Sequence, residues 1–174
     1  MKLQALRTAA LLIVAFGFLS RVQAQDPNLA NQYYINGEYE KAATLYAELA
    51  DSDRGLSDYY FARYLNCLLN LERFEEGEKA LKKQLKKSPG NVKLYVFYGN
   101  LYDRLGKMEE AQQQYQQAIE RMAPDYNAVT QLANTFVSSA KYDLAIKTYE
   151  RGSEMFKDPA RFAYNLGDLY RRKG

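Results

Sequence analysis

The stretch that decides the fold class covers residues 92–125 and reads VKLYVFYGNLYDRLGKMEEAQQQYQQAIERMAPD. Tyr95, Tyr98 and Tyr102 have the i, i+3, i+7 spacing of one helix face. A second helical pattern follows Gly106, a residue that ends a helix at low cost because it accepts a positive φ. The stretch therefore predicts a helix over residues 92–105, a turn at 106–107 and a second helix over 108–122.

The same pattern recurs along the chain with a period of about 34 residues. A large residue near the end of each first helix recurs as Tyr33, Leu68, Tyr102, Phe136 and Tyr170. Each second helix has a small residue, at Ala42, Gly77, Ala111 and Ala145, and four positions later Tyr46, Leu81, Tyr115 and Tyr149. This period is typical of stacked supersecondary units and not of a globule with one central core.

The motif Tyr95-x-x-Tyr98-Gly99-x-x-Tyr102, followed by Ala111-x-x-x-Tyr115-x-x-Ala118 and Pro124, resembles a tetratricopeptide repeat. The resemblance covers the whole chain after residue 24. It implies an all-α fold in which antiparallel helix pairs stack into a right-handed superhelical solenoid, with the first helices lining a concave groove. The register predicts four full repeats and a partial fifth, at about 25–57, 58–91, 92–125, 126–159 and 160–174.

Small residues predict where helices approach each other closely. Glycine inside a helix costs about 1 kcal/mol relative to alanine, so Gly99 is expected to contact the paired second helix. Leu65 replaces the small residue in repeat two and predicts a wider helix pair there. Glu72 and Ala140 occupy the turn position that Gly106 fills in repeat three.

Residues 1–24 have the layout of a cleavable secretory signal peptide. Lys2 and Arg7 precede an apolar run of about 13 residues, and the small-x-small sequence Val22-Gln-Ala24 follows it. The run is shorter than the roughly 20 residues that a membrane-spanning helix needs, although an uncleaved anchor is the alternative. Gln25 stands where a lipoprotein has cysteine. The sequence therefore predicts an exported protein, periplasmic or extracellular, without a lipid anchor or an integral membrane segment after cleavage.

The composition argues against an enzyme and against a cofactor. The chain has no histidine and one cysteine, so it cannot form a histidine-containing zinc cluster or a Ser–His or Cys–His nucleophile pair. Cys67 lies in an apolar stretch and is expected to be buried and inert. Acidic pairs such as Glu75-Glu76 lie at the starts of second helices, where a negative charge interacts favourably with the helix dipole and stabilises the helix.

The net charge gives no support for nucleic-acid binding. The whole chain carries 24 basic and 21 acidic residues, and three of the basic residues lie in residues 1–24. Without them the chain has 21 residues of each sign. Because nucleic-acid binding requires a basic face, such a partner is not expected.

The candidate binding residues follow from the position next to each small residue on the first helices. This position holds Asn31, Asn66, Asn100, Asn134 and Asp168. An asparagine amide offers two donors and an acceptor and can pair with a peptide unit, although asparagine is also common at this place in the family. Further side chains on the same expected face are Arg63, Lys93, Phe97, Arg104 and Gln131.

These observations predict a non-catalytic scaffold or adaptor of the cell envelope that binds a protein or an extended peptide in its groove. A membrane-associated assembly is one setting in which such a scaffold would act. A clamp for carboxylate tails is not expected, because Ala62 and Val96 replace the lysines found in such family members. The alternative is a regulatory or assembly segment of a longer envelope protein with a further module beyond residue 174. Residues 159–174 predict one helix, which either caps the array or belongs to a longer one.

Overall fold

The computed structural model describes residues 26–52 and 56–173. Within these ranges the chain forms nine α-helices and no β-strand, so the predicted all-α repeat fold is confirmed. The predicted signal peptide of residues 1–24 lies outside the described residues, as does Gly174.

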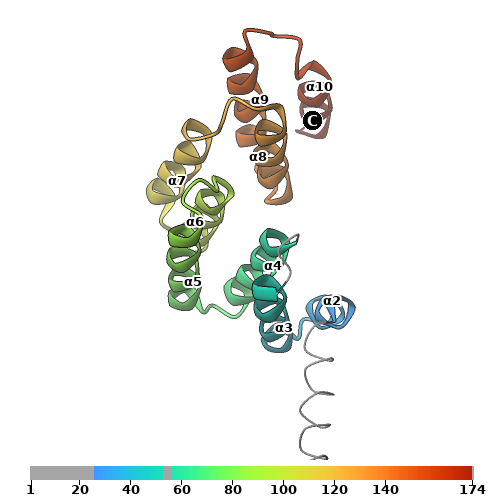
Figure 1. The fold of residues 1–174 in the computed structure, drawn as a ribbon, viewed down its shortest axis with the longest axis vertical. Coiled ribbons are helices and arrows are strands. Elements are labelled where there is room, and N and C mark those ends of the chain that lie inside the picture. The colour runs from blue at the N-terminus through green and yellow to red at the C-terminus, as the bar shows by residue number, and fades with distance from the viewer. Residues whose placement is uncertain (1–25, 53–55, 174) are drawn as a thin grey trace, which may run out of the picture. The chain divides into compact units, whose positions relative to one another are not determined.

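The chain divides into two compact units between Arg73 and Phe74 (Figure 1). Unit 1 contains helices α2 (Pro27–Ile35), α3 (Tyr39–Ser52) and α4 (Ser57–Asn70). Unit 2 contains α5 (Phe74–Lys87), α6 (Lys93–Arg104), α7 (Met108–Glu120), α8 (Tyr126–Ser138), α9 (Tyr142–Phe156) and α10 (Ala163–Lys173). Helices α6 and α7 therefore lie where the sequence of residues 92–125 predicts them.

Local chemistry explains where the helices begin and end. Asp26 and Asp125 cap α2 and α8, and their carboxylates accept hydrogen bonds from the first backbone N–H groups of these helices. Gly106 lies in the turn that follows α6 and has a φ of 72°. Glu72 and Ala140 adopt φ values of 57° and 56° in the equivalent turns, so the predicted turn positions are correct even where glycine is absent.

The core of unit 1 lies among α2, α3 and α4. Its buried residues are Ala30, Ala42, Ala43, Tyr46, Leu49, Tyr60 and Cys67. Helix α3 packs against both α2 and α4, and its alanines let the neighbouring helices approach. Cys67 is fully buried as expected, and burial raises the pKa of its thiol to about 11. The thiol is therefore protonated and unreactive at neutral pH.

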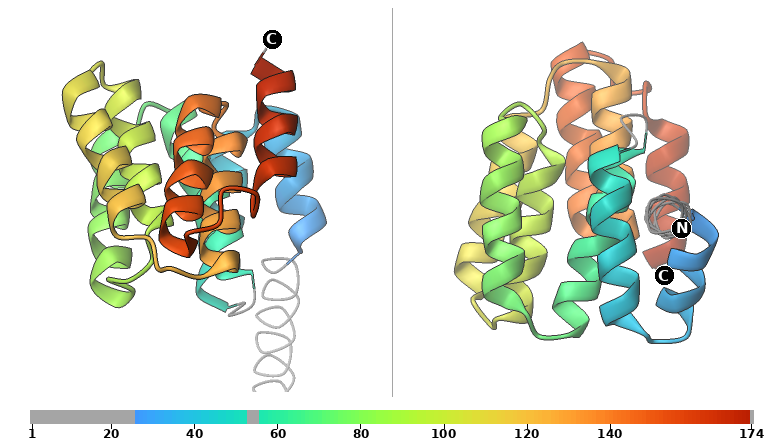
Figure 2. Two further views of the ribbon diagram at one scale, coloured as in Figure 1. Left: turned by 90° about the horizontal axis from the view of Figure 1, so that it is seen from above. Right: turned by 60° about the horizontal axis from the view of Figure 1, so that its bottom comes forward.

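Unit 2 is built from successive helix pairs. Helices α6 and α7 lie side by side, as do α8 and α9 (Figure 2), and contacts of α6 with α8 and of α7 with α9 join the two pairs. A Cβ atom placed on Gly99 would lie 2.1 Å from Cε1 of Tyr115, so only glycine allows this approach. The predicted close contact between Gly99 and the paired helix is therefore confirmed.

The last helix is shorter than the sequence predicts. Residues 159–162 form turns, and α10 begins at Ala163 instead of immediately after Pro159. Phe162 is fully buried among the rings of Tyr126, Tyr149 and Phe156, and this packing holds the segment before α10 in a non-helical path. None of the helices in the described ranges combines the length and the apolar character that crossing a membrane requires.

Candidate partner-binding surface

The ten predicted site residues lie on the first helices of the repeats, and the structure divides them between the two units. Unit 1 holds Asn31 on α2 and Arg63 and Asn66 on α4; unit 2 holds Lys93, Phe97, Asn100 and Arg104 on α6, Gln131 and Asn134 on α8, and Asp168 on α10. Because α6 contacts α8, the residues of these two helices belong to one continuous part of unit 2. Their use in binding stays a prediction.

In unit 1, Arg63 is held in place by two tyrosine rings. Its guanidinium carbon lies 4.8 Å from the ring centroid of Tyr34 and 5.3 Å from that of Tyr59. Its Nε donates a hydrogen bond of 3.2 Å to the hydroxyl oxygen of Tyr59. These contacts fix the guanidinium plane through its faces and one of its five N–H groups.

Asn66 lies one helical turn from Arg63 and is also fixed by its neighbours. Its Oδ1 accepts hydrogen bonds from the Tyr34 hydroxyl at 2.9 Å and from Nδ2 of Asn70 at 2.8 Å. Both bonds use the amide oxygen, and among the described residues Nδ2 of Asn66 has no acceptor. On α4, Asn66 therefore presents its donors on the exposed surface, and Arg63 beside it is half-buried.

In unit 2, helix α8 carries a row of exposed, uncharged polar side chains, called here the α8 row: Asn127, Gln131, Asn134 and Ser138. Their spacing of four, three and four residues places them on one face. Ser138 donates to the backbone oxygen of Asn134 at 2.9 Å. Within the described part of the chain, the amides of Asn127, Gln131 and Asn134 make no hydrogen bond and can all reach a partner.

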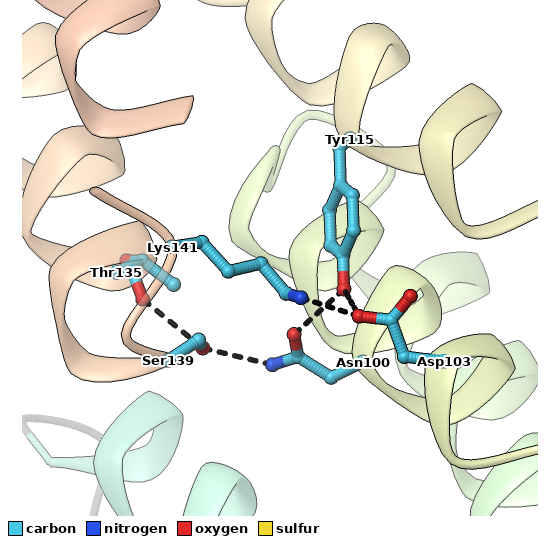
Figure 3. Close-up of polar contacts among 6 residues, drawn as sticks. All are labelled: Asn100, Asp103, Tyr115, Thr135, Ser139 and Lys141. Atoms are coloured by element: carbon cyan, nitrogen blue, oxygen red, sulfur yellow. Dashed lines mark hydrogen bonds and ion pairs between the residues drawn. The ribbon is translucent and has the colours of Figure 1, made fainter. Parts of the chain in front are cut away.

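Asn100 has a different environment, because it belongs to a polar network that joins repeats three and four (Figure 3). The Tyr115 hydroxyl donates to Oδ2 of Asp103 at 2.7 Å and lies 2.9 Å from Oδ1 of Asn100. Nδ2 of Asn100 donates to the Ser139 hydroxyl at 2.9 Å. Asn100 thereby connects α6 to α7 and to the end of α8.

A charged pair completes this network. Nζ of Lys141 pairs with Oδ2 of Asp103 and lies 4.8 Å from the centroid of the Tyr115 ring. The side chains of Asp103 and Lys141 are 24% and 25% exposed. Removing either partner would leave a largely buried charge without a counterion, which is destabilising. Burial and then the hydrogen bond to Asp103 hold the pKa of Tyr115 well above its usual range. The hydroxyl therefore stays protonated and continues to donate.

The remaining predicted residues differ in their exposure. Lys93 and Phe97 are half-buried on α6, whereas Arg104 and Asn31 are exposed. Asp168 on α10 pairs with Arg171 at 2.6 Å and with Arg172 at 2.7 Å, and the hydrogen bond from Arg171 lowers the pKa of its carboxyl. Asp168 is thus committed to its own helix.

Sequence reasoning did not find the groups that fix these residues. Tyr34 holds both Arg63 and Asn66, and Ser139 and Lys141 hold Asn100 and Asp103. The partners are separated by 29 to 39 residues, close to the repeat period, and this spacing is the signal that could have suggested contacts between adjacent repeats. No group of His, Cys, Asp and Glu in the described ranges could hold a metal ion.

Two sequence models of the tetratricopeptide repeat family match the chain, one over residues 68–133 and the other over residues 130–174. Together these matches cover all the described helices of unit 2. The chain belongs to the tetratricopeptide repeat family. Such repeats are generally non-catalytic modules for protein interaction, and their stacked helices provide extended binding surfaces.

A curated relative is the pre-mRNA-splicing factor SYF1 of Pyricularia oryzae, which is 30% identical over 81 residues. The match covers 47% of this chain and 10% of that protein, so the chain spans about a tenth of the relative's length. Among solved structures, MamA from Desulfovibrio magneticus RS-1 is 16% identical, with 75% of this chain and 73% of that chain covered and a TM-score of 0.41. BtubC from P. vanneervenii is 20% identical, with coverage of 82% and 69% and a TM-score of 0.43.

Proposed function

We propose that this protein is a non-catalytic scaffold that binds an extended segment of a partner protein along the first helices of its repeats. The observation that carries the proposal is the α8 row, in which Asn127, Gln131 and Asn134 expose amides that have no hydrogen-bond partner within the described ranges. Each amide offers both donors and an acceptor, which matches the donor and acceptor of a peptide unit.

The absence of charge in the α8 row favours the backbone of a partner over its charged side chains. A quarter of the chain consists of charged residues, yet none of the four members of the row is charged. Each net hydrogen bond contributes about 0.5–1.5 kcal/mol, so two or three such bonds give moderate affinity. The row therefore supports the binding of extended segments with little dependence on their side chains.

Unit 1 has a candidate contact of its own, in which the hydrogen-bond donors are held more rigidly. Tyr34 fixes both Arg63, which is half-buried, and Asn66, which is exposed. A fixed donor loses less conformational entropy on binding than a mobile side chain does. These two residues suit the carbonyl oxygens of a segment bound to unit 1, as a candidate contact separate from the α8 row of unit 2. Asn100 is left out of the proposed surface of unit 2, because its amide already donates a hydrogen bond to Ser139.

The test uses a phage-displayed library of random linear peptides selected on the protein. In the double variant Gln131→Ala/Asn134→Ala the selected peptides should bind more weakly, by a factor on the order of 10. The control variant Gln112→Ala/Gln113→Ala removes two exposed amides from α7 and should leave the affinity unchanged. Equal loss in both variants, or no loss in the first, would contradict the proposal.

We also propose that the scaffold acts in the cell envelope, as a periplasmic or extracellular protein. Support comes from the charged start, the apolar run and the small-x-small site of residues 1–24. N-terminal sequencing of the protein from an envelope fraction should give Gln25 as the first residue. Retention of Met1 in the exported protein would contradict cleavage.

An assembly role is the second candidate function, and one observation favours it. One side of α10 is not covered by another helix of the described chain, although the same side of α6 and of α8 is covered.

A further inference from the structure

Helix α5 and the loop after it carry a concentration of positive charge. Residues 79–93 contain six lysines and no Asp, Glu or Arg. Residues 25–174 have 21 residues of each sign, and six of the basic ones lie in this segment, which leaves 15 basic against 21 acidic residues elsewhere. The neutral total of residues 25–174 therefore combines a basic segment with an acidic remainder.

Three of these lysines form one face of α5. Lys79, Lys83 and Lys86 lie at i, i+4 and i+7 and are exposed. They project on the side of the helix opposite Leu81, which is fully buried. These three residues are called here the α5 lysine face. It extends about 10 Å along the helix axis, which is about one Debye length in physiological salt, so its charges act together on a partner.

The charges of the α5 lysine face are not neutralised by the described part of the chain. Lys82, beside the face, pairs with Glu78 at 2.7 Å. None of the three lysines of the face forms an ion pair with a described residue. The basic end of α10 differs, because its cations pair with Asp168 and Asp143. The α5 lysine face is therefore a surface of uncompensated positive charge.

The repeat register shows that this face is specific to α5. The equivalent residues are Thr44, Glu48 and Asp51 on α3, Gln113, Gln117 and Glu120 on α7, and Lys147, Arg151 and Glu154 on α9. None of these sets has three cations, so the packing of a second helix does not require them. Like charges four residues apart destabilise a helix slightly. The face therefore has a small cost to folding that the repeat fold itself does not explain.

The composition of α5 indicates the chemistry of the partner. Protein interfaces are enriched in aromatic residues, Met and Arg and depleted in Lys. Helix α5 has no arginine, and none of the exposed large hydrophobic residues of the described chain lies on it. It therefore also lacks exposed aromatic rings on which nucleic-acid bases could stack. The lysine ammonium is a flexible point charge, which suits a diffuse layer of negative charge such as anionic lipid headgroups.

We propose that the α5 lysine face binds the surface of a membrane that contains anionic lipids, through the phosphate groups of their headgroups. The apolar side of α5 is already used, because Leu81 is buried and Leu85 packs against the core of unit 2. The helix therefore adsorbs to the membrane surface and does not insert. The face lies on a second helix and the α8 row on a first helix, so either proposal can fail without the other.

The test measures by sedimentation how much of the whole protein binds to sucrose-loaded vesicles. Vesicles of phosphatidylcholine with phosphatidylglycerol should bind more protein than vesicles of phosphatidylcholine alone. The triple variant Lys79→Gln/Lys83→Gln/Lys86→Gln should bind the anionic vesicles at least about tenfold more weakly, because each lysine near an anionic surface contributes about fivefold. Residues 1–24 are the same in both proteins, so the difference isolates the lysines.

A matched control separates the face from the total charge. The variant Lys107→Gln/Lys147→Gln/Lys157→Gln also removes three exposed lysines from unit 2, but from positions that do not share one helix face. It should weaken binding to anionic vesicles by less than about threefold. An equal loss in the two triple variants would overturn the proposal. Circular dichroism establishes that both variants are folded.

Two further measurements locate the contact and identify its chemistry. Raising the salt concentration from about 0.1 M to about 1 M shortens the Debye length to about 3 Å and should remove the difference between the wild type and the α5 variant. Anionic vesicles should protect the α5 lysine face from acetylation more than they protect Lys107, Lys147 and Lys157. Equal protection would overturn the proposal, and binding to soluble polyglutamate without binding to vesicles would assign the face to an acidic polypeptide instead.

Discussion

Repeats one and three place a tyrosine at the same position of their second helices, yet the two hydroxyl groups have opposite surroundings. Tyr46 is buried on α3 and its hydroxyl has no hydrogen-bond partner among the described residues. Tyr115 is buried on α7 and its hydroxyl contacts Asp103 and Asn100. The aromatic ring fills the core in both repeats, but the polar atom is satisfied only in repeat three.

This difference shows that the repeat period and the hydrogen-bond network are independent properties. The period specifies where a large ring lies between two helices. The partners of the Tyr115 hydroxyl, Asp103 and Asn100, come from α6 of the same repeat. The adjacent repeat holds these two partners in place through Lys141 and Ser139. Two repeats can therefore share a family motif although the hydroxyl of the shared tyrosine is hydrogen-bonded in only one of them.

The largest expected effect tests the close contact of repeat three. Repeat one carries Ala30 at the position of Gly99, so the comparison asks whether alanine can replace glycine. Gly99→Ala would place a Cβ atom 2.1 Å from the Tyr115 ring and should destabilise the protein by about 3 kcal/mol. Urea denaturation followed by circular dichroism measures the change. A neutral substitution would mean that the ring moves without cost.

The next effect tests the two tyrosines directly. Tyr115→Phe should cost about 2 kcal/mol, because Asp103 and Asn100 lose a donor inside the protein. Tyr46→Phe removes a buried hydroxyl without a partner and should leave stability unchanged or raise it by up to about 1 kcal/mol. Paired urea unfolding curves give both values, and a comparable loss in both variants would refute the proposed difference.

A smaller effect compares two asparagines at the same register position. Asn100→Ala breaks contacts with Tyr115 and Ser139 and should cost about 1 kcal/mol of stability. Asn134→Ala removes an exposed amide and should change stability by less than about 0.5 kcal/mol. The same denaturation experiment measures both. If Asn134→Ala is the more destabilising variant, the assignment of Asn100 to structure and Asn134 to binding is reversed.

The last prediction concerns the pH dependence of stability at Tyr46, which has no effect at neutral pH and appears only at alkaline pH. Burial raises the pKa of Tyr46 to about 12, above its usual value of 10.0. The folded state therefore keeps the proton longer than the unfolded state, and stability present below pH 10 is lost as the pH rises toward 12. Urea midpoints at increasing alkaline pH should fall less in Tyr46→Phe than in the wild type, while an identical fall would exclude Tyr46 as a source.

Much of the fold could be predicted from local pattern. The helices of residues 92–125, the turns at Glu72 and Ala140 and the close contact at Gly99 all follow from spacing and residue size, because helix geometry repeats along the chain. The start of α10 could not be predicted, since it depends on how Phe162 packs among three rings from two other helices.

The candidate site, too, was predicted in part from the sequence and in part decided by the tertiary structure. The sequence alone determined the family, the helix pairs and the polar position on each first helix, because these depend on a regular period of residue types. Only the tertiary structure decided that Asn66 is held by Tyr34, that Asn134 is exposed and that Asn100 is used by Ser139. The physical reason is that a hydrogen bond depends on the distance between groups from different repeats, and that distance is not encoded by either repeat separately.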